Sequence, residues 1–233
     1  GLKYATSNTR GEFARCYLLG ASIYQRRGEF DQSLEWARLG LSIAQEQGNT
    51  ADQAYALLLM GNLWRDQGGF EQSIASLEEA RGLLDQMKDA THLGDALTSL
   101  GDVYWSTGRW QDALKCYQQS LQISENIGDV MGQASTSNKL ATVMVGRGEL
   151  AMALHLYQYS SEQFKRIGSL LGLATTGYQQ GEVMLHEGKP REAMHLFRVS
   201  MSSLERIKAR NSLSEVYRLA AEAMLMLEDT KEA

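Results

Sequence analysis

A repeat of forty residues constrains the fold of this chain more than any other feature of its 233 residues. Five glycines follow one another at this interval, and the next position in the series holds Glu228: Gly28, Gly68, Gly108, Gly148 and Gly188. The same order of small and large residues surrounds each glycine, most clearly in residues 100–117, LGDVYWSTGRWQDALKCY. Periods of about 20 to 50 residues are typical of solenoids, in which each repeat packs against its neighbours.

Each repeat is predicted to be a helical hairpin. Apolar residues recur at three- and four-residue spacings on both sides of the glycine, which is the pattern of two amphipathic helices joined by a turn. The predicted helix pairs are 11–27 with 31–47, 51–67 with 71–87, 92–107 with 111–127, 131–147 with 151–167 and 171–187 with 191–208, followed by a single helix over 212–227. Pro190 is the only proline, and it lies just inside a second helix, where its missing N–H costs nothing. The predicted fold class is therefore all-α.

The period also predicts the limits of the repeats. We expect residues 1–10 to be the end of a preceding repeat helix, and five repeats to occupy 11–50, 51–90, 91–130, 131–170 and 171–210, with the first helix of a truncated sixth over 211–233. Together they are expected to form a single solenoid domain. Because the chain starts at Gly1 in the middle of the pattern, we expect it to be a piece of a longer protein.

Composition argues against several classes of function. The net charge is −5 and the isoelectric point is near 5.5, so direct binding to nucleic acid, which depends on clustered Lys and Arg, is not expected. No apolar run approaches the roughly 18 residues of a membrane span, and the N-terminus lacks the pattern of a signal peptide. Cys16 and Cys116 are isolated in the sequence, which predicts reduced, partly buried thiols and favours a cytoplasmic protein.

Small and large residues recur at fixed positions in successive repeats. The first helices carry a small residue at Ala21, Gly61, Gly101, Ala141, Gly181 and Ala221. The second helices carry Ser33, Ser73, Ala113, Ala153 and Ala193, each followed four residues later by Ala37, Leu77, Tyr117, Tyr157 or Phe197. Small residues let two helix axes approach closely, and the large residues fill the space between them.

These positions resemble the tetratricopeptide repeat, in the forty-residue form that is similar to the repeats of kinesin light chains, of Leu-Gly-Asn-repeat polarity proteins and of bacterial signalling regulators. The resemblance covers essentially the whole chain. It implies a right-handed α-solenoid of about five and a half hairpins, whose first helices line a concave groove. It also implies a scaffold that binds other proteins.

Seven residues on the first helices are candidates for partner binding in that groove, since the hydrophobic pattern does not need them: Asn62, Arg65, Asp102, Trp105, Asn138, Tyr178 and Glu182. The asparagine amides can both donate to and accept from the backbone of an extended peptide. Arg65 can bind a carboxylate through two hydrogen bonds, and Trp105 and Tyr178 offer large amphipathic surfaces. The alternative for each of the seven is an ordinary surface residue, although Trp105 favours the binding role because an exposed tryptophan otherwise promotes aggregation. Trp105 directly follows Tyr104, so the two rings should point to different faces, with Tyr104 in the core.

We find no sequence pattern for catalysis, a cofactor or a metal. His155 and His195 lie one repeat apart, but no carboxylate or cysteine completes a ligand set, so exposed polar residues are the preferred interpretation. The preferred function is a non-enzymatic scaffold that binds a protein or peptide, and the alternative is a ligand- or peptide-sensing regulatory domain of a multidomain signalling or transcription regulator. The last helix, with apolar residues at Leu219, Met224 and Leu225, leaves self-association as a further possibility beside a simple boundary of the chain.

Overall fold

The computed structural model describes the backbone of residues 7–232 and the side chains of residues 13–228. This part of the chain contains eleven α-helices and no strand, so the predicted all-α class is confirmed. The first six helices are α1 (Ser7–Arg26), α2 (Phe30–Glu46), α3 (Thr50–Asp66), α4 (Phe70–Met87), α5 (Ala90–Ser106) and α6 (Trp110–Ile127). The others are α7 (Val130–Gly146), α8 (Leu150–Arg166), α9 (Leu170–His186), α10 (Pro190–Arg206) and α11 (Arg210–Glu232).

The turn glycines end the first helix of each hairpin in the left-handed conformation that glycine adopts without strain. The φ angles of the five lie between 72° and 79°. At Gly108 the backbone N–H donates to the carbonyl of Trp105 at 3.1 Å, and the N–H of Arg109 donates to that of Tyr104 at 2.8 Å. These two hydrogen bonds satisfy helix carbonyls that would otherwise lack a donor, which is why the turn recurs with the glycine.

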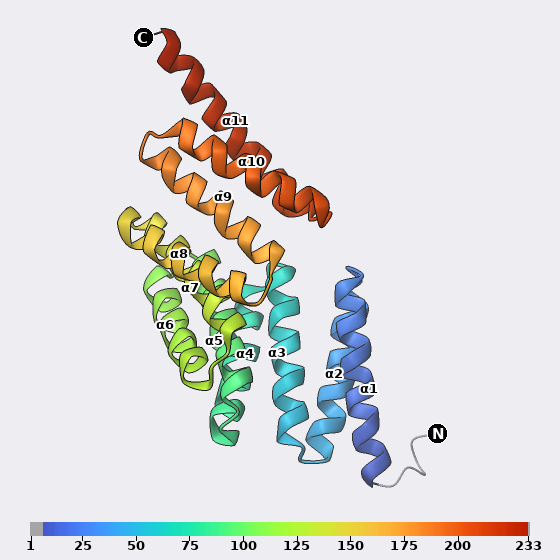
Figure 1. Ribbon diagram of the computed structural model, residues 1–233. Coiled ribbons are helices and arrows are strands. Elements are labelled where there is room, and N and C mark those ends of the chain that lie inside the picture. Colours follow the sequence, from blue (N-terminus) through green and yellow to red (C-terminus); the bar gives the residue numbers. More distant parts are fainter. Residues whose placement is uncertain (1–6, 233) are drawn as a thin grey trace. The chain divides into compact units, whose positions relative to one another are not determined.

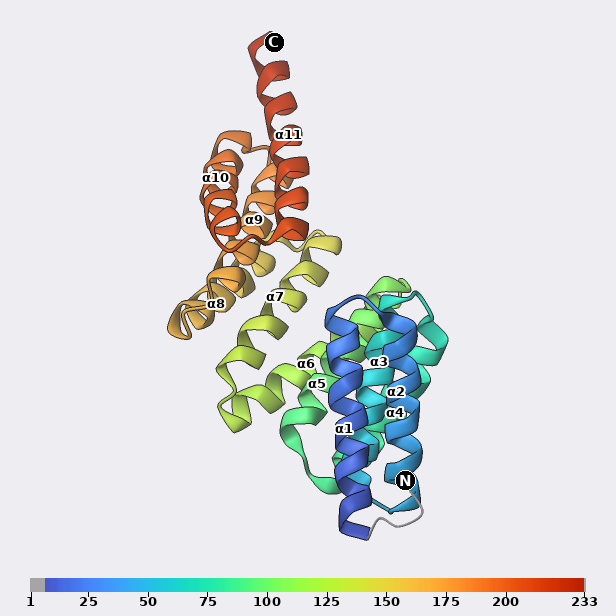
Figure 2. The ribbon, with the colours of Figure 1, turned by 90° about the vertical axis from the view of Figure 1, so that its right-hand side faces the viewer.

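The chain divides into two compact units, residues 1–123 and residues 124–233. In the first unit α1 pairs with α2, α3 with α4 and α5 with α6, and the first helices α1, α3 and α5 are neighbours (Figures 1 and 2). A hydrogen bond of 2.9 Å from Ser120 Oγ to the carbonyl of Gly94 joins α6 to α5. The assignment of residues to individual repeats and to one domain stays a prediction.

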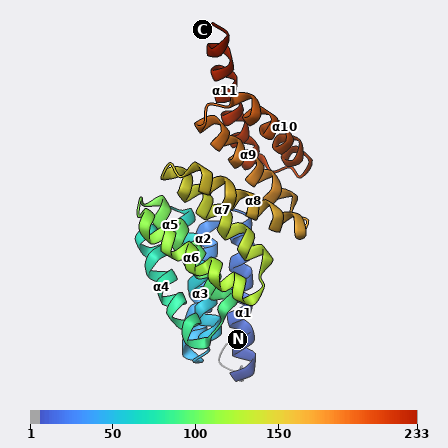
Figure 3. The same cartoon turned by 60° about the vertical axis from the view of Figure 1, so that its left-hand side comes forward.

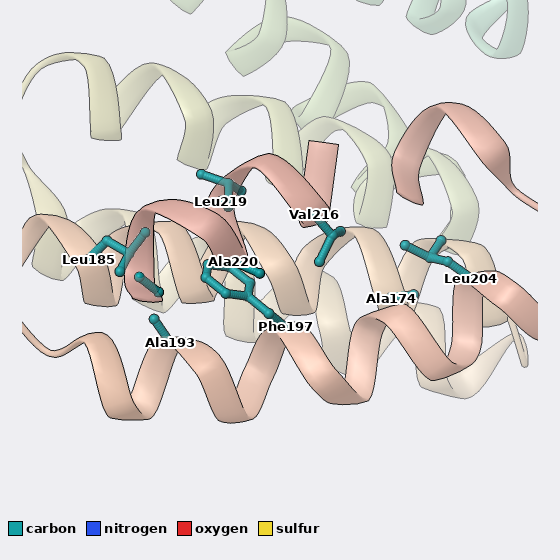
Figure 4. Packing of buried hydrophobic residues seen from close by; sticks show 9 residues of the cluster. Ala174, Leu185, Ala193, Phe197, Leu204, Val216, Leu219 and Ala220 are labelled. Atoms are coloured by element: carbon teal, nitrogen blue, oxygen red, sulfur yellow. The ribbon is translucent and has the colours of Figure 1, made fainter. Parts of the chain in front are cut away.

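In the second unit α7 pairs with α8 and α9 with α10, and α11 packs against α10 (Figure 3). Its first helices α7, α9 and α11 are again neighbours. A hydrophobic cluster joins α9, α10 and α11, with the Phe197 side chain lying among Leu185, Val216 and Ala220 (Figure 4). Methionines, among them Met184 and Met194, pack against the edge of this cluster.

The small residues act as the sequence predicted. A Cβ atom added to Gly61 would lie 2.5 Å from Leu77 Cγ, and one added to Gly181 would lie 2.5 Å from the Phe197 ring. Gly101 faces the Tyr117 ring in the same way, closely enough that a Cβ would overlap it. These three hairpins therefore depend on a missing side chain in the first helix to seat a large side chain from the second.

Both ends of the helical region differ from the prediction. α1 begins at Ser7, so residues 7–10 belong to the first helix of the first hairpin and not to a preceding helix, while residues 1–6 lie outside the described residues. α11 continues through Glu228, where the period predicted a turn. The physical reason is that glutamate replaces the turn glycine there, and glutamate favours the helical conformation. On α11 Leu219 is buried, whereas Met224 and Leu225 are exposed, and self-association through this helix stays a prediction.

Two further findings concern the surface of the described residues. None of their helices is both long and apolar enough to cross a membrane. Both cysteines are free thiols, but Cys16 is exposed and only Cys116 is partly buried. The expectation that both thiols are partly buried is therefore wrong for Cys16, which no neighbouring helix covers.

Candidate functional site

All seven candidate residues lie on first helices, and the structure divides them between the two units. Asn62 and Arg65 on α3 and Asp102 and Trp105 on α5 belong to the first unit, and Asn138 on α7 with Tyr178 and Glu182 on α9 belong to the second. We call the surface formed by the first helices of one unit its first-helix face. The two faces are described separately below.

Arg65 already has two carboxylate partners within the chain. Its Nη1 lies 3.3 Å from Asp102 Oδ2 on the neighbouring helix α5, and its Nη2 lies 3.0 Å from Asp66 Oδ1. Asp66 also accepts a hydrogen bond of 3.3 Å from Gln25 Nε2 on α1. Arg65 therefore links α3 to α5, and a carboxylate of a ligand would compete with Asp66 and Asp102 for its guanidinium group.

Asp102 is held from a second direction by Tyr117. The hydroxyl of Tyr117 donates a 2.7 Å hydrogen bond to Asp102 Oδ1, across the hairpin from α6 to α5. Burial raises the pKa of Tyr117, and the nearby Asp102 carboxylate raises it further, so Tyr117 remains a hydrogen-bond donor at physiological pH. The same arrangement recurs in the next repeat, where the hydroxyls of Tyr157 and Thr142 lie 3.1 Å apart.

Asn62 occupies the position of Asp102 in the preceding repeat, but it lacks this support. The residue facing it from the second helix is Leu77, which has no hydroxyl group. Asn62 Oδ1 is buried and has no hydrogen-bond partner among the described residues. A buried amide oxygen without a donor costs free energy, so Asn62 is the polar group of this face with unused hydrogen-bonding capacity.

Two tryptophans lie together beside Asp102. The rings of Trp105 and Trp110 have centroids 6.2 Å apart, and Trp105 is half-buried while 48% of Trp110 is exposed. Tyr104 is buried, as predicted, and the Arg109 guanidinium lies 4.2 Å from the centre of its ring. Trp105 and Tyr104 therefore lie in different surroundings although they are adjacent in the sequence: Tyr104 lies in the core and Trp105 lies beside Trp110.

In the second unit the amide nitrogen of Asn138 is engaged with α9. Its Nδ2 donates to Gln179 Oε1 at 2.7 Å and to Thr176 Oγ1 at 3.0 Å. Gln179 and Thr176 were not among the sequence candidates. A signal for such pairs exists, because the polar partners on neighbouring first helices lie 37 to 41 residues apart: Arg15 with Asp52, Arg65 with Asp102, Gln25 with Asp66, and Asn138 with Gln179.

Tyr178 and Glu182 lie one turn apart on α9, which places them on the same side of the helix, and both are half-buried. Burial raises the pKa of Glu182, although Arg218 on α11 and His186 act in the opposite direction. Arg218 itself is bound by Glu215, with 2.6 Å between Nη2 and Oε1, and lies 3.6 Å from Glu222. Among the described residues Glu182 forms no hydrogen bond or ion pair.

A comparison with protein families identifies part of the chain. The profile described as tetratricopeptide repeat matches residues 92–166, which include the hairpin of α5 and α6. Residues 92–166 are similar to tetratricopeptide repeats. The resemblance predicted from the spacing of small and large residues is thus confirmed for this stretch, and a search of curated proteins finds no match.

Solved structures share the fold over most of the chain. Aspartyl phosphate phosphatase F from Bacillus subtilis is 12% identical with a TM-score of 0.70, and 92% of this chain aligns with 60% of that one. The Rap conjugation gene regulator of plasmid pLS20, solved with the Phr* peptide, is 15% identical with a TM-score of 0.73, and 92% of this chain aligns with 62% of it. This chain therefore spans less than two thirds of either protein.

A third similar structure shares the predicted fold. A Podosopora anserina protein described as a kinesin light chain with nearly identical TPR-like repeats is 13% identical with a TM-score of 0.67, and 85% of this chain aligns with 97% of it. At these identities the likeness concerns the fold alone. It confirms the predicted fold class, an α-solenoid of tetratricopeptide hairpins.

The groups that could carry out chemistry are potential metal ligands and potential nucleophiles. Among the described residues no three His, Cys, Asp or Glu side chains are grouped as metal ligands, and His155 and His195 are both exposed. Burial, together with the nearby Glu78 carboxylate, raises the pKa of the Cys116 thiol to about 11, which makes it a poor nucleophile at neutral pH. The arrangement of polar and aromatic groups on the first-helix faces is suited to recognising a partner.

Proposed function

We propose that this chain is a non-enzymatic scaffold that binds a peptide or a partner helix on its first-helix faces. One observation carries the proposal: Asn62 and Glu182 occupy the same repeat position in the two units, and neither forms a hydrogen bond or ion pair among the described residues, whereas Asp102 and Thr142 at that position do. Unused polar groups beside aromatic side chains are what a partner needs for specific contacts.

The similar structures support a peptide as the partner. The plasmid pLS20 regulator was solved with the Phr* peptide, and its fold matches 92% of this chain. Asn62 can donate to and accept from a peptide backbone, while Trp105 supplies a large surface at low entropic cost. The partner-binding set that we propose is Asn62, Arg65, Asp102, Trp105, Asn138, Tyr178 and Glu182. In this set Arg65, Asp102 and Asn138 orient the surface, because their side chains are already engaged within the chain.

A selection from a displayed library of random twelve-residue peptides on the immobilised chain tests this proposal. Asn62→Ala and Trp105→Ala should each weaken binding of the selected peptides by about tenfold or more, the effect expected of interface hot spots. Gln118→Ala, on the exposed side of the second helix α6, serves as the control and should bind as the wild type does. If no peptide is enriched above an unrelated immobilised protein, or if both variants bind unchanged, the proposal is wrong.

A second candidate function is a ligand- or peptide-sensing regulatory domain. The shared fold of the plasmid pLS20 conjugation gene regulator, which was solved with the Phr* peptide, supports it, and a ligand that favours one conformation of the chain would change the dimensions of the molecule. Small-angle scattering with and without a selected peptide tests it. A change in the radius of gyration on binding would favour the sensor, and an unchanged radius would favour a rigid scaffold.

A further inference from the structure

The surroundings of Glu182 suggest which chemical class of ligand the second unit binds. Glu182 lies on α9, with Tyr178 one turn before it and His186 one turn after it. Its carboxylate acts electrostatically on the hydroxyls of Tyr157 and Tyr178, so it lies near both tyrosines. A half-buried carboxylate with no hydrogen bond or ion pair is costly, and such groups normally have a partner of opposite charge.

Among residues 13–228 no cationic side chain forms an ion pair with Glu182. Arg218 is the cation of α11 that acts on Glu182, but its guanidinium group is bound by Glu215 through Nε at 3.2 Å and Nη2 at 2.6 Å. Glu222 lies 3.6 Å from Nη1 of the same group. One arginine thus faces three carboxylates, so this part of the first-helix face keeps an excess of negative charge.

A comparison between repeats explains why Glu182 lacks a hydrogen-bond donor as well. At the equivalent positions the Tyr117 hydroxyl donates to Asp102, and the Tyr157 hydroxyl bonds to Thr142. Phe197 takes the place of these tyrosines opposite α9, with its ring against Gly181. Phenylalanine fills the same space but has no hydroxyl, so the carboxylate at this position is left to interact with something outside the chain.

We propose that Glu182 binds a cationic side chain, an ammonium or guanidinium group, of the peptide that occupies the first-helix face of the second unit. The inference rests on the proposed function and adds the charge of the ligand. Tyr178, on the same side of α9, provides an aromatic wall for the methylene stem of a lysine or arginine and favours a cation near its ring. Glu182 accepts a charge-assisted hydrogen bond from the cation, which is roughly twice as strong as a neutral one.

The displayed-peptide selection tests this inference when it is repeated on the Glu182→Gln variant. The wild type should enrich peptides with Lys or Arg at one fixed position, and Glu182→Gln should bind those peptides about tenfold more weakly. Replacing the selected Lys or Arg in a synthetic peptide by norleucine or citrulline should lower wild-type affinity to the same extent and leave the affinity of Glu182→Gln unchanged. Glu192→Gln, an exposed glutamate of α10, is the matched control.

The outcomes separate this inference from the proposed function. Enriched peptides without a basic residue, or basic peptides that bind Glu182→Gln as tightly as the wild type, would overturn the inference and leave the scaffold function standing. Absence of any enriched peptide would overturn both. Loss of binding through misfolding is checked by the melting temperature of Glu182→Gln, which should be no lower than that of the wild type because the variant removes an unpaired, half-buried charge.

Discussion

Tyr117 on α6 donates a 2.7 Å hydrogen bond to Asp102 on α5, so the second helix of a hairpin holds a polar side chain of the first-helix face in place. Tyr157 contacts Thr142 in the same way in the following repeat, at 3.1 Å. The hydroxyl of the tyrosine therefore has a second role beyond the packing of its ring, and its partner is a carboxylate in one repeat and a neutral hydroxyl in the next.

Tyr117→Phe should lower the free energy of unfolding by about 1–2 kcal/mol, because it leaves a partly buried carboxylate without one of its donors. Tyr157→Phe should cost less, about 0.5–1 kcal/mol, since its partner is a neutral hydroxyl. Urea denaturation of the two variants measures both. If Tyr157→Phe costs as much as Tyr117→Phe, the charge of Asp102 does not strengthen the interaction.

Gly101→Ala should destabilise the chain by about 1–3 kcal/mol, because its Cβ would overlap the Tyr117 ring within a packed hairpin. Gly82 is the matched control. It lies within the helix α4, it is exposed, and a Cβ there meets no atom within 4 Å, so Gly82→Ala should stabilise by about 0.5–1 kcal/mol. Thermal melts of the two variants should shift in opposite directions, and a shift in the same direction would contradict the packing argument.

Lys88 and Lys208 occupy left-handed turns, with φ angles of 56° and 58°, where the corresponding turns of other repeats have Gly48, Gly128 and Gly168. A side chain in this conformation costs about 1–2 kcal/mol. Lys88→Gly and Lys208→Gly should therefore each raise the free energy of unfolding by up to about 1 kcal/mol, after the entropy of the added glycine is taken into account. Lys115→Gly, within the helix α6, should have the opposite effect in the same denaturation assay.

The two cysteines should differ in reactivity. Burial raises the pKa of Cys116 from 9.0 to about 11, whereas Cys16 is exposed, so at pH 8 the Cys116 thiolate is about 100-fold rarer than for an ordinary thiol. Iodoacetamide labelling followed by peptide mass spectrometry should modify Cys16 first and Cys116 at least about 100-fold more slowly. Similar rates would mean that the groove between α4 and α6, where Cys116 lies, opens readily.

Glu182 should make stability depend on pH. Burial raises the pKa of Glu182 in the folded state. The contribution of Glu182 to the free energy of unfolding is therefore fully present below the ordinary pKa of 4.5, where the carboxyl group is neutral, and is lost as the pH rises through the folded pKa. Glu182→Gln cannot ionise at this position, so it removes this loss of stability. The variant should melt at a higher temperature than the wild type at neutral pH, and the difference should disappear below about pH 4. An equal difference at both pH values would show that the effect does not come from ionisation.

The sequence by itself determined the hairpins. The helices, the turns at Gly28 and its successors, and the contacts between small and large residues all follow from interactions that are local or that repeat every forty residues. Such interactions leave a periodic pattern that a single sequence displays. The period was misleading at Glu228, where glutamate replaces the turn glycine and α11 continues instead of ending.

Only the tertiary structure decided how the candidate binding residues are used. The sequence placed Arg65, Asn62 and Asn138 on the first helices. It did not show which of these side chains form hydrogen bonds within the chain and which has a polar atom without a partner. Arg65 is bound to Asp102, Asn138 is bound to Gln179, and Asn62 Oδ1 has no partner among the described residues. The reason is physical: each pairing depends on the separation of neighbouring first helices to within a hydrogen-bond length, and helical periodicity fixes the face of a residue but not that separation.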